Sequence, residues 1–126
     1  APLAPRTELT PPSSARTVTR DLVTGEWKVD QVEEGGVWRF DAIDLECSEG
    51  INVEYRIRDD DPLSASARWN YHTSRRREGW DIEIKSSYAV RATREAFVVE
   101  VEMQAWDEGR DVFHRTWKHN VPREGV

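Results

Sequence analysis

Residues 80–90 constrain the fold more than any other stretch, because apolar and polar side chains alternate along them. One parity carries Trp80, Ile82, Ile84, Tyr88 and Val90, and the other carries Asp81, Glu83 and Lys85. A period of two residues is typical of a β-strand with one buried face and one face in water. The segment therefore predicts a long strand with two unlike faces.

Similar segments follow one another along most of the chain. Alternation or β-branched composition marks residues 16–22, 26–32, 37–40, 51–57, 64–74, 97–105 and 112–119. Turn signals separate them at residues 24–25, 33–36, 59–62, 75–79, 93–95 and 107–110. The acidic segment 41–49 fits either an edge strand or an irregular loop. No segment has a helical pattern.

Short turns make consecutive strands antiparallel neighbours, and strands of ten or more residues must twist. We therefore expect an all-β fold, an antiparallel meander of long twisted strands that curls into a half-barrel or β-sandwich, with no significant helix. A chain of 126 residues suits one domain.

The first fifteen residues differ from the rest, since four of them are proline. Proline excludes a regular helix and favours extended backbone. We expect a proline-rich linker or strap over residues 1–15 and a single all-β accessory domain over residues 16–126. The chain begins with Ala instead of Met, which suggests that it is cut from a longer protein.

Composition limits the classes of partner. The net charge of −6 argues against a nucleic-acid partner, because phosphate binding needs a basic surface. No apolar run approaches the ~20 residues of a membrane span, and no signal-peptide pattern is visible, so we expect no membrane partner and a cytoplasmic location. The single cysteine, Cys47, allows neither an intrachain disulfide nor a thiolate metal site.

Two groups of polar residues were weighed as sites. The run Asp59-Asp60-Asp61-Pro62 offers oxygen ligands for calcium but lacks the alternating ligands and the glycine of calcium loops. A turn whose side chains accept local backbone hydrogen bonds is the better prediction. Of the three histidines, His72 and His114 share a parity with charged residues, which predicts that they face solvent. The third is His119.

The sequence gives equally little support for a catalytic nucleophile or for a ligand-binding site. Ser64 and Ser66 lack a Gly-x-Ser-x-Gly elbow, so no Ser-His-Asp triad is expected. Residues 75–77, all arginine, could hold a phosphate or a carboxylate, but blunting a strand end and balancing neighbouring Glu and Asp is the simpler role. The Trp and Tyr residues could line a pocket as in lipocalin-like barrels, or fill the core. The sequence therefore predicts no catalytic, cofactor-binding or metal-binding residue, and no cofactor.

Four motifs resemble a known family. Residues 55–65 read Tyr-Arg-Ile-Arg-Asp-Asp-Asp-Pro-Leu-Ser-Ala and are similar to the "YSI…DDPLSA" stretch near the C-terminus of CocE/NonD-type hydrolases, the X-Pro dipeptidyl-peptidase and cocaine-esterase family. Residues 16–25 resemble the family's "R-x-V-x-x-D-x-x-T-G". Trp80 follows an Arg-rich turn, like "R-x-x-W", and residues 112–123 resemble "VF-x-R-x-W…IPR". Arg56 stands where Ser is common, and the aspartate run is one residue longer.

The resemblance covers roughly residues 5–126 and implies a C-terminal tail without catalytic residues of its own. In the family, an upstream α/β-hydrolase domain carries the triad and a jelly-roll region follows it. The resemblance thus implies a non-catalytic β domain of a larger serine hydrolase acting on ester, amide or X-Pro peptide bonds. The domain would serve packing or assembly, with those upstream domains as partners or as a homo-oligomer.

Two further possibilities remain open on the sequence. The first is a free-standing calycin-like module that binds a small apolar ligand in a closed interior, which an open sheet would count against. The second is an enzyme with a site of its own, for which no residue pattern argues. If a partner domain covers the sheet, unusually exposed aromatic residues should mark the contact.

Overall fold

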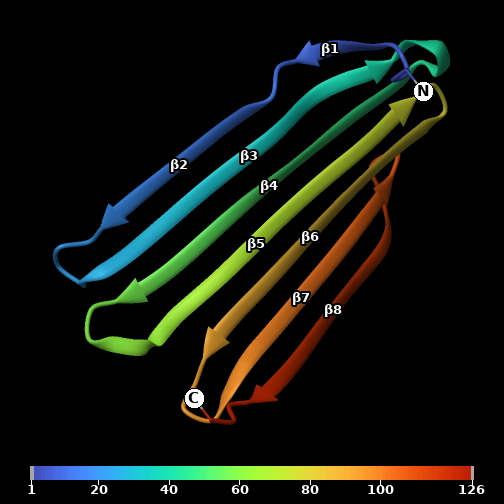
Figure 1. The fold of residues 1–126 in the computed structure, drawn as a ribbon. Helices are drawn as coiled ribbons and strands as arrows, with labels where there is room; N and C mark the ends of the chain where they lie inside the picture. The colour runs from blue at the N-terminus through green and yellow to red at the C-terminus, as the bar shows by residue number, and fades with distance from the viewer. Residues whose placement is uncertain (1, 126) are drawn as a thin grey trace.

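A computed structural model describes residues 2–125, most of which lie in β-strands (Figure 1). The strands are β1 (Arg6–Thr10), β2 (Ser13–Arg20), β3 (Glu26–Phe40), β4 (Leu45–Arg58), β5 (Asp61–Arg77), β6 (Trp80–Ala92), β7 (Ala96–Asp107) and β8 (Arg110–Pro122). Within the described range the only helical element is the single 3₁₀ turn η1 (Asp41–Ile43).

All eight strands belong to one antiparallel sheet in the order β1-β3-β4-β5-β6-β7-β8, and β2 pairs with the other half of β3. This confirms the predicted all-β meander. The sheet remains open: β8 forms one edge, and β1 and β2 together form the other (Figure 1). The described residues form no second sheet that packs on it. The molecule is therefore a single twisted layer.

The pairing register assigns every side chain to one of two faces, because residues directly opposite each other on antiparallel strands point the same way. One row across the sheet reads Gln31, Val53, Trp69, Tyr88, Val101 and Trp117. The next row reads Asn52, Asn70, Ser87, Glu102 and Thr116. Apolar and polar rows thus alternate, as the period of two predicts.

We call the two surfaces the aromatic face and the polar face. The apolar members of the aromatic face include Val18, Trp27, Val29, Ile51, Val53, Tyr55, Ile57, Ala67, Trp69, Tyr71, Ile82, Ile84, Tyr88, Val90, Val99, Val101, Met103, Ala105, Phe113 and Trp117. The polar face carries mainly Lys28, Asp30, Asn52, Glu54, Arg56, Arg68, Asn70, His72, Lys85, Ser87, Glu100, Glu102, Gln104, His114, Thr116 and Lys118.

The turn expected at residues 33–36 is wrong, because β3 runs through it. The ladder with β4 shifts register between Glu34 and Val37, which makes the glycine pair a β-bulge. Gly36 has φ +78°, a conformation that glycine adopts without steric cost. An ideal Cβ there would lie 2.3 Å from the Thr10 carbonyl oxygen, so the bulge also lets β1 approach β3 closely.

The first residues are more regular than the expected linker. β1 and the start of β2 lie within residues 1–15 and pair with β3, and Pro11 and Pro12 occupy the break between them. Proline is tolerated there because an edge strand has one side free of ladder hydrogen bonds. Threonine and leucine in β1 supply the β propensity. The proline-rich lead therefore forms much of one sheet edge.

Two other expectations are refined. The ambiguous segment 41–49 divides into η1 and the start of β4, where Asp44 has φ +49°. The aspartate run makes a tight turn at Asp59 and Asp60, and β5 begins at Asp61. Pro62 is therefore the second residue of a strand and does not end one, since the strand preceding it already stops at Arg58.

The sheet has almost no interior. Among the described residues, only Cys47 and Val98 are buried apolar side chains. The chain exposes 9143 Å², whereas a folded monomer of 14.6 kDa exposes about 6,900 Å² by the usual scaling of surface with mass. Domains normally bury a sheet's apolar face against a second layer. In this structure no such layer covers the aromatic face.

Candidate docking face

Large side chains of the aromatic face remain in contact with solvent. Tyr55 is 45% exposed, Tyr88 is 39% exposed and Trp117 is 37% exposed. The side chains of Tyr71, Trp27, Ile57 and Phe113 are each at least 36% exposed. Contiguous exposed apolar patches larger than a few hundred Å² are rare on soluble monomers and mark interaction sites. If a partner domain covers the sheet, exposed aromatic residues are expected at the contact, and this face carries such residues.

The centre of the aromatic face is ordered by contacts between its own rings. Tyr55 and Trp69 pack edge to face, with ring centroids 6.0 Å apart. Ser86, the residue that pairs with Tyr71 across β5 and β6, has a small side chain and is only 7% exposed. Rigid aromatic side chains lose little conformational entropy when they are covered. The arrangement is therefore suited to contact another surface.

The size of the face follows from strand geometry. Six strands, β3 to β8, spaced about 4.8 Å apart and about 12 residues long give roughly 24 by 40 Å, or about 1,000 Å². The edge of this area carries charge of two signs. Glu33 on β3 and Glu49 on β4 are exposed near one side, while Arg115 and His119 lie on β8 at the other. The face is apolar at its centre and polar at its rim, as protein interfaces are.

The polar face shows the opposite character, since its side chains pair with one another. Arg56 contacts both Glu26 and Glu54. Asn52 donates a 2.7 Å hydrogen bond to Asp30, and Lys118 lies 4.0 Å from Glu100. Exposed pairs of this kind add little stability but keep the surface hydrated. The polar face is therefore the solvent side of the sheet.

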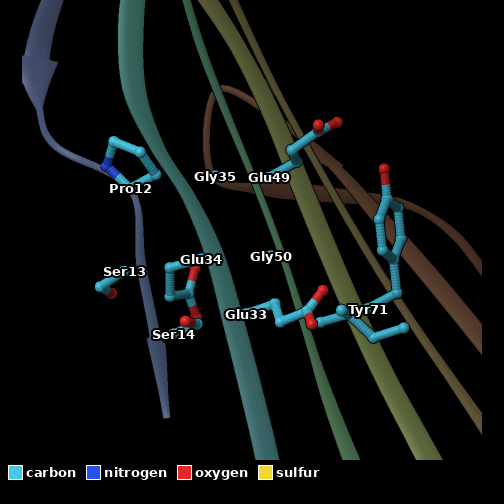
Figure 2. Close-up of a pocket in the computed structure, with 10 residues that line it drawn as sticks. Pro12, Ser13, Ser14, Glu33, Glu34, Gly35, Glu49, Gly50 and Tyr71 are labelled. Atoms are coloured by element: carbon cyan, nitrogen blue, oxygen red, sulfur yellow. The ribbon is translucent and has the colours of Figure 1, made fainter.

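A hollow of about 620 Å³ lies beside the β3 bulge (Figure 2). Glu33, Glu34 and Glu49 line it together with Tyr71. Figure 2 shows the Glu33 and Glu34 side chains diverging from β3, as expected for neighbours on opposite faces. No group of three metal-ligating side chains occurs in residues 2–125.

The aspartate turn serves structure through side chains, not through the local backbone donors that were predicted. Asp59 accepts hydrogen bonds from the Arg20 guanidinium at 2.6 Å and the Trp27 indole N–H at 3.0 Å. These two donors, Arg20 first, lower the pKa of the Asp59 carboxyl. Asp61 accepts from Arg58 at 2.8 Å. The run therefore ties the β4–β5 turn to the β2–β3 hairpin.

The three histidines do not converge. His72 lies 3.0 Å from Glu34 and His114 lies 3.2 Å from Glu102, both on the polar face and both half exposed, as predicted. Three strand spacings, about 14 Å, separate β5 from β8. His119 pairs with Val99 and so lies on the aromatic face. The His72–Glu34 contact passes over Gly50, where a Cβ would lie 2.1 Å from the Glu34 carboxylate.

The serine and arginine candidates have structural partners. The Ser64 hydroxyl donates to the Asp61 carbonyl at 2.6 Å and accepts the Arg58 backbone N–H at 2.8 Å. Arg75 donates to backbone carbonyls, including Ser74 at 2.8 Å. Since Arg75, Arg76 and Arg77 alternate between the two faces, they do not form a phosphate site. Ser66 lies on the polar face opposite Arg56.

Sequence reasoning missed the residues that hold the sheet edge. The Trp38 ring lies between the guanidinium groups of Arg6 and Arg75, at 5.7 and 6.0 Å from its centroid. Arg6 belongs to the segment expected to be a linker, so the pattern gave no reason to pair it. At the opposite end, Arg123 donates to the Thr93 carbonyl at 2.9 Å. These contacts join distant segments, which periodicity does not detect.

No helix in the described part of the chain is long and apolar enough to cross a membrane. Comparisons with protein-family models, curated proteins and solved structures found no match to this chain. The two faces of the sheet and the motifs in the sequence are therefore the features that bear on function.

Proposed function

We propose that this chain is a non-catalytic accessory β domain of a larger serine hydrolase, and that its role is packing or assembly through the aromatic face. The observation that carries the proposal is the uncovered aromatic face itself. A single-layer sheet with about 2,200 Å² more exposed surface than a monomer of its mass is incomplete as a domain. A covering partner supplies the missing second layer.

The sequence motifs support the parentage. Asp21 of the "R-x-V-x-x-D-x-x-T-G"-like stretch accepts the backbone N–H groups of Val23 and Thr24 at 2.8 and 3.1 Å and shapes the β2–β3 turn. Arg123 of the "IPR"-like stretch secures the β6–β7 turn. If the chain is a tail domain of the CocE/NonD-type hydrolases, its motif residues are expected to hold the fold together, as these turn-forming residues do. By this resemblance the parent acts on ester, amide or X-Pro peptide bonds.

The chemistry of the chain agrees with a non-catalytic role. Within the residues that the structure describes, each serine or histidine weighed as a catalytic group either has a structural partner or lies away from the others. The free-standing calycin-like module is the weaker alternative, because its ligand requires a closed interior and the sheet is open. The catalytic groups of the proposal belong to the upstream α/β-hydrolase domain.

Two measurements test the proposal. The purified chain should give no turnover of a nitrophenyl ester above the buffer rate, and turnover would overturn the non-catalytic role. The reading frame upstream of Ala1 should encode a Gly-x-Ser-x-Gly nucleophile elbow. A frame without such a hydrolase domain would overturn the parentage.

A further inference from the structure

The charge pattern and dimensions of the aromatic face point to one occupant. We infer that a second copy of this chain covers it, giving a face-to-face β-sandwich dimer whose two-fold axis runs along the strands between β5 and β6. This inference rests on the proposed docking role and names the partner. Three observations support it: the area of the aromatic face, the opposite charges at its two sides, and the sizes of the side chains that would face each other.

The area is sufficient for a stable dimer. Covering about 1,000 Å² on each copy buries about 2,000 Å² in total, at the upper end of the range of standard stable interfaces. The two apolar sheets would then pack about 10 Å apart with aligned strands, as in other β-sandwiches. Each copy supplies the second layer that the other lacks.

Charge selects the direction of the axis. An axis along the strands between β5 and β6 places β3 of one copy over β8 of the other. Glu33 and Arg115 lie in one row of the sheet, with Ile51, Tyr71, Ser86 and Met103 between them. Glu33 therefore faces Arg115 of the partner subunit. The usual crossing angle offsets the pair by about 6 Å, which two long side chains can span.

A perpendicular axis through the same row is disfavoured by the same residues. It would place β3 over β3 and β8 over β8, so the exposed Glu33 and Arg115 side chains would each approach their own kind. Both residues are exposed, and none of the ion pairs found among residues 2–125 includes either of them. Glu33 accepts only a 2.7 Å hydrogen bond from Gln31 on its own strand.

Side-chain sizes match about the same axis. β5 then lies over β6 of the partner subunit, so Tyr71 faces the partner's Ser86 and Trp69 faces the partner's Tyr88. Serine is small, so a tyrosine ring opposite Ser86 meets a short side chain instead of another ring. Large side chains opposite small ones are how two layers interdigitate at native density.

Sedimentation equilibrium of the full chain from about 1 to 100 µM tests the inference, since association depends on concentration. We expect a dimer. Glu33→Arg and Arg115→Glu should each weaken it about tenfold, and the double reversal should restore most of the affinity. Tyr88→Glu, at a half-exposed central position, should weaken it about a hundredfold. Glu100→Arg on the polar face is the matched control and should leave the dimer unchanged.

The remaining outcomes separate the inference from the proposed function. A monomer whose tryptophans are freely quenched by acrylamide overturns the second copy and retains the docking face for another domain of the parent. A monomer with shielded tryptophans overturns the docking face as well, and the proposed function with it. A dimer that Glu100→Arg dissociates and the aromatic-face variants leave intact overturns the assigned surface.

Discussion

Replacement of Gly36 by alanine tests the packing of β1 against the β3 bulge. The ideal Cβ at this position lies 2.3 Å from the Thr10 carbonyl oxygen and 2.9 Å from backbone atoms of Pro11 and Pro12. These neighbours are backbone, so they cannot move aside as a flexible side chain would. Gly79 is the matched control, because it has φ +74° but no atom within 4 Å of its ideal Cβ.

The expected costs follow from two terms. A left-handed conformation costs a non-glycine residue about 1 kcal/mol, and Gly79→Ala should show only this. Gly36→Ala adds the cost of displacing β1, whose residues Arg6, Thr7 and Glu8 pair with β3. Loss of two or three net hydrogen bonds at about 1 kcal/mol each brings the total to about 3–4 kcal/mol.

Chemical denaturation of the two variants at one protein concentration, followed by tryptophan fluorescence, measures this difference. Amide hydrogen exchange should show lost protection in residues 6–10 of Gly36→Ala and unchanged protection there in Gly79→Ala. Equal destabilisation of the two variants, with β1 still protected in both, would refute the close approach of β1 to the bulge.

Three more outcomes can be measured. The pKa values of Asp21 and Asp59 are lowered by the hydrogen bonds that these carboxylates accept. Their contribution to stability is therefore present above the unfolded pKa of 3.8 and is lost as the pH falls through the lower folded pKa values. In an acid titration, Asp59→Asn should lose stability less steeply than the unmutated chain. Cys47 is 1% exposed, so Ellman's reagent should react with it at the unfolding rate. Val98→Ala, at a buried site, should cost about 1–2 kcal/mol by chemical denaturation, and Val112→Ala, 59% exposed, should cost almost nothing.

The strands and their faces were predictable because they depend on local pattern. Residues 80–90 alternate so regularly that Tyr88 and Val90 could be assigned to one face before any pairing was known. From β3 onward, each short turn between strands then made the next strand an antiparallel neighbour, which is the sheet order observed there. The solvent-facing positions of His72 and His114 followed from the same parity.

The sheet edge was not predictable because its causes are non-local. A glycine pair predicts a turn and a β-bulge equally, and only pairing with β4 decides that Gly35 and Gly36 form a bulge. β1 lies among prolines, and its pairing depends on contacts such as that of Arg6 with Trp38. Such contacts join residues more than thirty positions apart, beyond the reach of a periodic pattern.

The covering of the aromatic face is a different kind of unknown, since parity tells which side chains share a face and not what lies over them. Alternation predicts a face protected from water, and the register brings those residues together, yet Tyr55 and Tyr88 remain about two-fifths exposed. Selection for burial acts on the assembled protein, so a sequence can carry a core pattern whose other half belongs to another molecule. The opposite charges of Glu33 and Arg115 are the part of the pattern that specifies this molecule as a second copy of the chain.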